Sequence, residues 1–245
     1  MDPLARARVQ SLEVEERVTS TNDRVRHPEP DPGSVRCVVA GEQTAGRGRR
    51  GRRWDSRRGE GIYYSMAISL NEPVPGFTSL ATAVRIVDSL VDMGVEGINL
   101  KWPNDILHGG KKLGGILIEQ VPRGPRWTVI VGLGLNLDTP DASDRTGLKQ
   151  CADMQAIPLD KLIARLTEGL VSLLIDPGIT VSWSQLRSRW QELDQFQGRN
   201  VRLIRDEGEL TGRALGIDTD GALLLETAEG VQRCLLGDAS LRGRL

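Results

Sequence analysis

The sequence predicts an α+β protein with a small all-β domain at its C-terminal end. Strand-like segments dominate residues 35–137, two amphipathic helices follow between residues 159 and 193, and short β-rich runs separated by tight turns fill the remainder. Strands that come first and helices that are grouped after them are typical of α+β folds. We therefore expect a larger domain over residues 1–196 and a small β domain over residues 197–245.

The length and composition are those of a globular chain. It has 245 residues, of which 39% are hydrophobic and 27% charged, and its formal net charge is −1. No apolar run approaches the roughly 20 residues of a membrane helix, and Met1–Gln10 lacks the apolar stretch of a secretory signal. Three widely spaced cysteines match no metal-binding spacing. We expect a cytoplasmic protein with reduced cysteines and no membrane partner.

The elements of the larger domain follow from short-range patterns. Apolar and β-branched runs predict strands, whereas the spacing of Leu80, Val84 and Val87 predicts a helix that begins with Thr78 as its cap and stops at Gly94. Residues 139–156 lack periodicity and are expected to form a loop. In chain order the predicted strands are 35–40, 61–70, 98–102, 113–120 and 127–137, and the later helices are 159–175 and 181–193.

The C-terminal region has a different sequence pattern, in which short β-rich runs alternate with tight turns. Asp220-Gly221 lies between two β-rich runs, and Asp-Gly in this setting is a strong hairpin signal. Several short strands within such a short segment predict a small barrel. The expected strands are 200–205, 209–217, 221–227, 231–235 and 239–241.

A loop rich in arginine and glycine follows the first predicted strand. Seven arginines lie between Gly46 and Arg58. The segment GRGRRG formally matches a dinucleotide-binding fingerprint, but no helix with an apolar face opens there, so we set that interpretation aside. Two interpretations remain: a solvated basic loop, or a loop that becomes ordered around a phosphate chain, to which guanidinium groups bind in bidentate fashion. Trp54 in this loop is either a core anchor or a stacking platform for a purine.

The segment Lys101–Asp105 (KWPND) ends another predicted strand. Side chains alternate along a strand, so Lys101 and Trp102 should face opposite sides, and Pro103 ends regular pairing. Asn104 and Asp105 offer oxygens that suit Mg²⁺ or a ribose. On spacing alone, a plain strand end followed by an Asn-Asp turn is the preferred interpretation.

Glycines interrupt two neighbouring strands, at Gly114-Gly115 and at Gly132 and Gly134. Glycine inside a strand marks either a bulge or the close approach of a ligand or another backbone. Two adjacent strands of this kind predict a slot for a flat, mostly apolar ligand.

The run Ser20-Thr21-Asn22 is typical of the start of a helix, where one such side chain is enough for capping. The other two leave hydrogen-bond donors and acceptors that could bind a small polar head group.

Together these segments resemble the biotin protein ligases. The resemblance implies a catalytic domain like that of class II aminoacyl-tRNA synthetases, with a mixed sheet flanked by helices, and an SH3-like β-barrel as the C-terminal domain. The motifs occur in the family's order, and residues 216–226 and 240–242 resemble the family's C-terminal domain. The matching segments of the catalytic domain are Ser20-Thr21-Asn22, 43–54 (QTAGRGRRGRRW), 101–105 (KWPND), 112–116 (KLGGI) and 132–136 (GLGLN).

The resemblance also implies an activity. ATP would activate biotin as biotinyl-5′-AMP, and biotin would then pass to a specific lysine of the biotin carboxyl carrier domain of a biotin-dependent carboxylase. Mg²⁺ would arrive with ATP, and Asn104 would help to position both. No tightly bound cofactor and no metal site built from protein alone is expected, since His27 and His108 are isolated.

Roles are implied residue by residue. Lys101, for example, would neutralise phosphate charge in the transition state, and Trp54 would stack on adenine. The catalytic set would be Lys101, Arg47, Arg49 and Lys112. The biotin-binding set would be Ser20, Thr21, Asn22, Gln43, Arg47, Gly48, Arg49, Trp102, Lys112, Gly114, Gly115 and Gly134. The ATP-binding set would be Arg47, Arg49, Trp54, Lys101, Asn104, Lys112, Asn136 and Arg242.

Two other functions compete with that of a biotin protein ligase. Lipoate–protein ligase resembles this fold and chemistry but lacks the arginine-glycine segment as written here. An RNA-binding module would use the basic loop and the small barrel, and the near-zero net charge opposes it.

Some biotin protein ligases also have an N-terminal helix-turn-helix that binds DNA. The 19 residues before Ser20 are too few for it. We therefore expect the monofunctional form without a DNA partner. Whether the chain forms a homodimer is left open.

Overall fold

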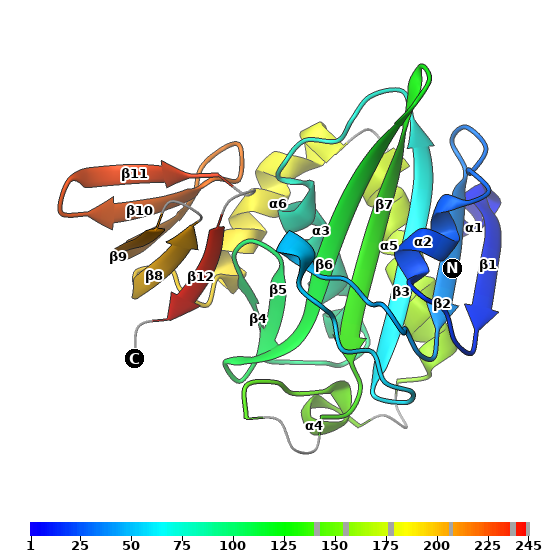
Figure 1. Cartoon of the computed structure of the whole chain (residues 1–245), viewed down its shortest axis with the longest axis horizontal. Helices are drawn as coiled ribbons and strands as arrows, with labels where there is room; N and C mark the ends of the chain where they lie inside the picture. The colour runs from blue at the N-terminus through cyan, green and yellow to red at the C-terminus, as the bar shows by residue number, and fades with distance from the viewer. Residues whose placement is uncertain (140–142, 154–156, 176–178, 206–207, 236–238, 244–245) are drawn as a thin grey trace.

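The computed structural model has a seven-stranded sheet followed by a five-stranded sheet (Figure 1). It describes residues 1–139, 143–153, 157–175, 179–205, 208–235 and 239–243. The larger sheet has the order β1-β2-β3-β7-β6-β5-β4, in which β1 and β2 are parallel and the other pairs antiparallel. Its strands are β1 (Val9–Glu15), β2 (Val35–Ala40), β3 (Gly61–Leu70), β4 (Ile98–Lys101), β5 (Asp105–His108), β6 (Lys111–Arg123) and β7 (Arg126–Asn136).

Helices cover one face of this mixed sheet and leave the centre of the other face to a loop. The long helices α3 (Thr78–Asp92), α5 (Leu159–Ile175) and α6 (Ile179–Leu193) lie behind the sheet in Figure 1. The short helix α2 (Thr21–Arg26) lies in front, against β2, β3 and β7. The main hydrophobic core fills the space between the sheet and the long helices. A mixed sheet with helices, followed by a separate β unit, confirms the predicted α+β class.

The ends of α3 show how well local signals locate an element. At Gly94 the backbone adopts φ +88°, and the amide of Val95 donates to the carbonyl oxygen of Leu90 at 3.0 Å. This is the usual arrangement at a glycine that ends a helix, so the predicted stop is confirmed. The predicted cap was one residue late, because Phe77 is the N-cap and the Thr78 hydroxyl donates to the carbonyl oxygen of Pro75 at 2.6 Å.

Three regions differ from the expected elements. Helix α1 (Pro3–Arg8) and strand β1 precede Ser20, where no element was predicted. Strand β5 begins at Asp105, where a turn was expected, and the short helix α4 (Leu148–Cys151) lies inside the expected loop. Residues 140–142 and 154–156 of that loop lie outside the described residues. Strand β1 alternates half-buried and exposed positions, so it lacks the continuous apolar run that reveals a buried strand.

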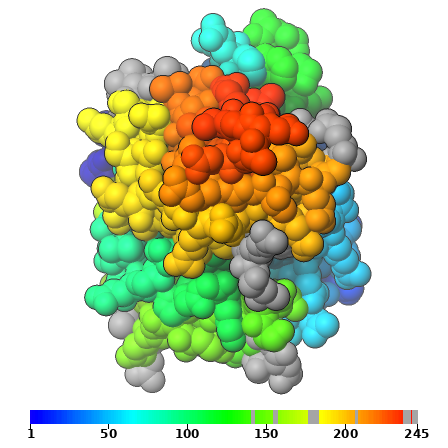
Figure 2. Space-filling model, turned by 90° about the vertical axis from the view of Figure 1, so that its left-hand side faces the viewer, coloured from blue at the N-terminus to red at the C-terminus, as the bar shows by residue number. Residues whose placement is uncertain are grey.

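The C-terminal strands form an antiparallel sheet of order β11-β10-β9-β8-β12. Viewed from its side in Figure 2, this sheet (orange to red) is seated against α6 (yellow) and the β4–β5 region (green). It comprises β8 (Asn200–Arg205), β9 (Gly208–Ile217), β10 (Leu223–Thr227), β11 (Gly230–Cys234) and β12 (Ala239–Gly243).

One turn of this sheet receives two tryptophans of the larger domain. The indole N–H of Trp102 donates to the carbonyl oxygen of Gly221 at 3.1 Å, and that of Trp183 to the carbonyl oxygen of Thr219 at 2.6 Å. Trp102 is fully buried, and Trp183 stacks on Phe77 with ring centroids 4.6 Å apart. The β9–β10 turn is therefore packed directly against the segment that contains KWPND.

The cysteines and the helices bear on the expected cellular setting. Cys37, Cys151 and Cys234 are all free thiols. Burial raises the pKa of the Cys37 thiol to about 11, so this group is neutral at physiological pH. Within the part of the chain that the structure describes, no helix combines the length and apolar character needed to cross a membrane.

Candidate functional site

A pocket on the front face of the large sheet brings most of the predicted site residues together. The walls come from the start of α2, the arginine-glycine loop, the start of β5, and strands β6 and β7. The predicted residues that line it are Ser20, Thr21, Asn22, Gln43, Arg47, Gly48, Arg49, Trp54, Asn104, Lys112, Gly115 and Gly134.

One end of the pocket is an uncharged network of buried polar groups. The backbone amide and hydroxyl of Thr21 both donate to Oε1 of Gln43, at 2.8 and 3.0 Å. Nε2 of Gln43 donates to the hydroxyl oxygen of Ser56 at 2.9 Å. Ser65 lies beneath, with its hydroxyl 2.6 Å from Oδ1 of Asn22 and 2.7 Å from Oγ1 of Thr21. Ser20, Thr21, Asn22, Gln43 and Ser65 are called the polar end below.

Gly132 allows α2 to approach the sheet at the polar end. A Cβ atom at position 132 would lie 2.3 Å from Oδ1 of Asn22, which is far inside van der Waals contact. Any larger residue on β7 would push Asn22 away. The glycine at this position therefore makes room for a protein side chain.

Trp54 fills the space beside the other strand glycines. A Cβ atom on Gly134 would lie 2.3 Å from Cε2 of Trp54, and one on Gly115 would lie 3.0 Å from its Cζ3. The ammonium of Lys112 is 4.9 Å from the centroid of the same ring, within cation–π range. The predicted slot between β6 and β7 exists, but the flat group that lies in it here is the indole of Trp54.

The opposite end of the pocket is lined by Lys112, Asp105 and Arg49, and Lys101 lies behind Asp105. These four residues are called the cationic end below. Asp105 holds the two lysines together, since its Oδ2 is 2.6 Å from Nζ of Lys101 and its Oδ1 is 2.6 Å from Nζ of Lys112. Its side chain is only 13% exposed. Arg49 points an N–H toward Oδ1 of Asn104 at 3.5 Å. Cationic groups from three separate segments therefore converge here.

Burial and charge both act on the ionisable groups at the cationic end. Burial by itself would raise the pKa of the Asp105 carboxyl, but the ammonium groups of Lys112 and Lys101 outweigh it and hold that pKa below its usual value. Burial lowers the pKa of the Lys112 ammonium, and the attraction of Asp105 opposes this change. Asp105 therefore remains ionised at neutral pH and favours the charged form of Lys112.

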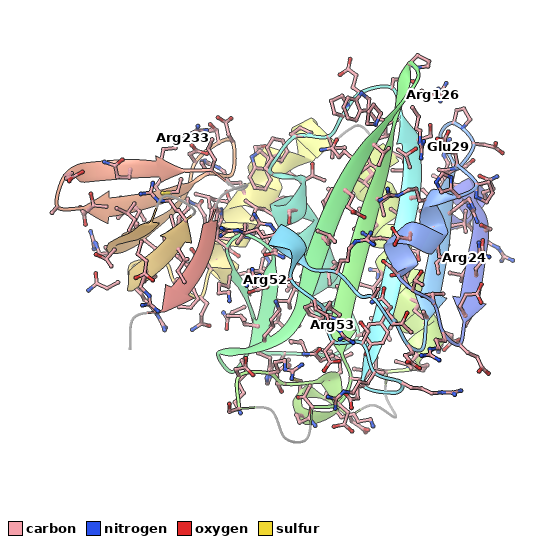
Figure 3. The ribbon with its side chains drawn as sticks, viewed as in Figure 1. Arg24, Glu29, Arg52, Arg53, Arg126 and Arg233 are labelled. Carbon is pink, nitrogen blue, oxygen red and sulfur yellow. The ribbon has the colours of Figure 1, made fainter. Side chains whose placement is uncertain are left out.

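The arginines of the loop are not equivalent. Arg47 donates to both carboxylate oxygens of Asp23, at 2.6 and 2.8 Å, and lies 3.4 Å from Glu119. Arg52 and Arg53 also line the pocket and lie on the loop that crosses the front of the sheet (Figure 3).

Four predicted site residues lie away from the pocket lining. Trp102, expected to line the slot, points into the core because side chains alternate along the strand and Lys101 takes the opposite side. The same alternation turns Gly114 toward Leu135 and away from the pocket. Asn136 donates to the carbonyl oxygens of Lys112 and Thr146, both at 3.1 Å, and so supports the start of β6. Lys101 reaches the site through Asp105.

Arg242 cannot be placed in the same way. It lies on β12, where its backbone pairs with Arg202 on β8. Its side chain lies outside the described residues. The role implied for Arg242 therefore stays a prediction.

The sequence carries no sign of one residue that lines the pocket, Asp105, as a partner of the lysines, nor of three residues that support the lining from behind. Asp105 was noted only as an oxygen donor, and Asp23, Ser65 and Glu119 were assigned no role. Glu119 accepts from Nδ2 of Asn22 at 2.7 Å across 97 residues of sequence. An acid that becomes important only through such a distant partner has no local signal.

The chain matches known proteins along most of its length. A profile of the biotin/lipoate A/B protein ligase family matches residues 14–136, and a profile of the biotin protein ligase C-terminal domain matches residues 196–242. The chain is 34% identical over 236 residues to the bifunctional ligase/repressor BirA of Salmonella typhimurium, which covers 92% of this chain and 72% of that protein. It is 31% identical over 206 residues to the biotin–[acetyl-CoA-carboxylase] ligase of Mycobacterium tuberculosis, with 77% and 72% covered.

Solved structures agree with these matches. The biotin protein ligase of Aquifex aeolicus, determined in complex with biotin and ATP, superposes with a TM-score of 0.76 at 28% identity and covers 96% of this chain and 100% of that one. The chain therefore belongs to the biotin/lipoate A/B protein ligase family, within which its relatives are biotin protein ligases.

Proposed function

We propose that this chain activates biotin with ATP and transfers it to a lysine of a biotin carboxyl carrier domain. The observation that supports this most directly is the division of one pocket into two ends. Neutral hydrogen-bonding side chains form the polar end, where the charge of Arg47 is paired with Asp23 and Glu119, and unbalanced positive charge gathers at the cationic end. A bicyclic amide-like head group suits the first, and a carboxylate that meets a triphosphate suits the second. Family membership makes biotin and ATP the expected pair.

The proposed reaction has two half-reactions. A carboxylate oxygen of biotin attacks the α-phosphorus of ATP, the bond to the β-phosphate bridging oxygen breaks, and biotinyl-5′-AMP and pyrophosphate form. The neutral ε-amine of the acceptor lysine then attacks the acyl carbon, the bond to AMP breaks, and the amine gives up a proton as the amide forms. Neither step needs a covalent enzyme intermediate.

The residues divide between these tasks according to their surroundings. Thr21, Asn22 and Gln43 would orient the head group, because each is already fixed by hydrogen bonds. Lys112 and Arg49 would face the carboxylate and phosphates, with Lys101 behind them across Asp105. Preorganised cations of this kind stabilise charge that develops in a transition state. Trp54 would present an aromatic surface to the nucleotide.

Mg²⁺ would enter with the phosphates of ATP. Both oxygens of Asp105 already contact ammonium groups, which makes this carboxylate a poor metal ligand. Asn104 lines the pocket beside the cationic end, and its Oδ1 has only a long contact of 3.5 Å with Arg49, so we take it as the candidate protein oxygen. The ion would neutralise phosphate charge there, while the lysines and Arg49 orient the phosphates.

Further parts of the proposal concern setting and partners. We place the protein in the cytoplasm, which its free thiols support, and we divide it between residues 196 and 197. Residues ahead of Ser20 form α1 and β1, and β1 is a strand of the large sheet, so we propose no DNA partner for this segment. A homodimer stays an open prediction, to be measured by sedimentation with and without biotin.

The deciding experiment is biotin-dependent exchange of labelled pyrophosphate into ATP. We expect exchange with biotin and none without it. Lipoate in place of biotin is the matched control, because the two ligase types share this family. Exchange that requires lipoate would contradict the proposal. Retention of RNA at low salt without any exchange would favour a nucleic-acid-binding role instead.

A further inference from the structure

The guanidinium of Arg47 is held by two carboxylates. Nη1 and Nη2 donate to the two oxygens of Asp23 at 2.6 and 2.8 Å, and Nη2 is also 3.4 Å from both oxygens of Glu119. Hydrogen bonds from Arg47 hold the pKa of the Asp23 carboxyl below its usual value. The pair is therefore fully charged at neutral pH. Bidentate arginine–carboxylate pairs are among the stronger and geometrically more specific ion pairs.

These contacts connect three segments around the polar end. Asp23 follows Asn22 on α2, and Glu119 on β6 accepts from Nδ2 of Asn22 at 2.7 Å and from Arg26 at 3.3 Å. Arg47 extends from the arginine-glycine loop to the same two acids. A side chain that should help to bind biotin, Asn22, is therefore tied into the network that also holds Arg47.

Backbone hydrogen bonds within the arginine-glycine loop hold the segment around Arg47 in a defined shape. The amide of Gly48 donates to the carbonyl oxygen of Arg52 at 2.7 Å. The amide of Trp54 donates to the carbonyl oxygen of Gly46 at 2.9 Å. These bonds close a narrow hairpin that ends at Trp54. The pair Arg47–Asp23 fastens this hairpin to α2.

An arginine in this position is poorly suited to gather phosphates. To bind one it would exchange a bidentate contact with Asp23 for a similar contact with another anion, so the net gain is small. Lys112 and Arg49 lie at the cationic end, whereas both acids that hold Arg47 flank Asn22.

We propose that Asp23 is a positioning residue that, through Arg47, fastens the hairpin 46–54 over the biotin end of the pocket. The three side chains Arg47, Asp23 and Glu119 form what is called the Arg47 latch below. In this arrangement Arg47 controls the release of biotin and does not stabilise charge on the phosphates. That biotin is the retained ligand rests on the proposed function.

The test is the substitution Asp23→Asn, which keeps the shape of the side chain and removes its charge. We expect biotin to dissociate about two to five times faster, the upper part of the range for loss of an exposed ion pair. The rate of adenylate formation at saturating biotin and ATP should change less than twofold. Without any ligand, trypsin should cut the loop between Arg47 and Arg58 several times faster, because the hairpin is no longer fastened.

A matched control lies elsewhere in the molecule. Asp92 on α3 is paired with Arg165 on α5 at 2.5 Å, and its side chain is 50% exposed against 44% for Asp23. Asp92→Asn should change neither biotin release nor cleavage of the loop. The exchange of charges in Asp23→Arg with Arg47→Asp should restore slow cleavage relative to either single variant.

Two results would overturn the latch. Unchanged biotin release and unchanged cleavage in Asp23→Asn would mean that the ion pair holds nothing in place. A faster adenylation step with a lower KM for ATP would mean that Asp23 competes with the phosphates for Arg47. If the wild-type protein bound no biotin, the proposed function would fail, and the ligand-free cleavage rates would still decide whether Asp23 fastens the loop.

Discussion

The polar end and the cationic end of the pocket organise their side chains by different physical means. At the polar end, uncharged groups satisfy one another through short hydrogen bonds, as between Thr21 and Gln43. At the cationic end, one carboxylate, Asp105, holds two ammonium groups 2.6 Å away on either side. Buried neutral networks fix shape, whereas clustered cations create a field for a negative ligand. The difference suggests that the polar end determines which acid binds and the cationic end determines how fast it reacts.

The substitution Lys101→Ala tests this division between the two ends of the pocket most strongly. We expect adenylate formation to fall by about two to three orders of magnitude, the usual effect of losing one preorganised charge contact, while biotin affinity stays nearly unchanged. Asp105 keeps Lys112 as a partner, so thermal stability should change little. Pyrophosphate exchange measures adenylate formation, and calorimetry measures biotin affinity and thermal stability.

Supplying synthetic biotinyl-AMP provides the control for Lys101→Ala. Transfer from this intermediate to carrier protein should continue at a substantial rate, because the phosphate chemistry has been bypassed. Loss of both half-reactions with unchanged stability would instead assign Lys101 a role in aminolysis. A sharp fall in melting temperature would point to a structural role for KWPND.

Two alanine substitutions on β7 should each affect only one end of the pocket. Gly132→Ala places a methyl group against Asn22, and Gly134→Ala places one against Trp54. Overpacking costs about 1–3 kcal/mol, which, if it falls on the binding-competent geometry, corresponds to roughly fivefold to 150-fold in affinity. We expect Gly132→Ala to weaken biotin binding and Gly134→Ala to raise the KM for ATP, as measured by titration calorimetry and initial rates. Equal effects of both variants on both ligands would contradict the division of the pocket.

The cationic end should also respond to pH. In Asp105→Asn the attraction that favours charged Lys112 is lost, while the burial that lowers its pKa remains. The pKa of Lys112 should therefore fall further, and the alkaline limb of the adenylation rate should move toward neutral pH. Asp138→Asn, in an exposed pair with Lys149, should leave the profile unchanged. An unshifted limb in Asp105→Asn would mean that Lys112 does not titrate in this range.

The smallest effect is expected at Ser65. Ser65→Ala leaves Oδ1 of Asn22 without its buried donor, which costs about 1–3 kcal/mol of folding free energy, and biotin affinity should fall only a few-fold. Ser89→Ala is the control, because that hydroxyl donates to the carbonyl oxygen of Arg85 within α3. Thermal unfolding compares the two; equal melting temperatures would show that Ser65 contributes no net stability.

The sequence predicted elements wherever a buried face left a continuous pattern. Strands β2 and β3 are apolar and buried over nearly their whole length, and both were found within a residue of their ends. Strand β1 is an edge strand with exposed Leu12 and Val14, and β5 has four residues directly after a turn. Neither offers a run long enough to distinguish it from a loop.

The site was predictable to a similar degree and for a similar reason. The motifs converge because β3, β7 and β6 are neighbours at the centre of the sheet, and each motif has a local pattern. The acids that pair with Arg47 have no such local pattern, because Asp23 is 24 residues away from it in sequence and Glu119 is 72 residues away. Which acids lie beside which arginine depends on tertiary geometry that single-sequence patterns do not encode.

The turn that receives Trp102 and Trp183 ties the two sheets into one cooperative unit. Removing the C-terminal strands would leave two buried indole N–H groups without acceptors and expose the aromatic stack of Phe77 on Trp183. The chain should therefore unfold in a single calorimetric transition. Substitutions in the β9–β10 turn should therefore alter the position of the KWPND segment although they touch no substrate, because the small sheet supports that segment of the proposed nucleotide site.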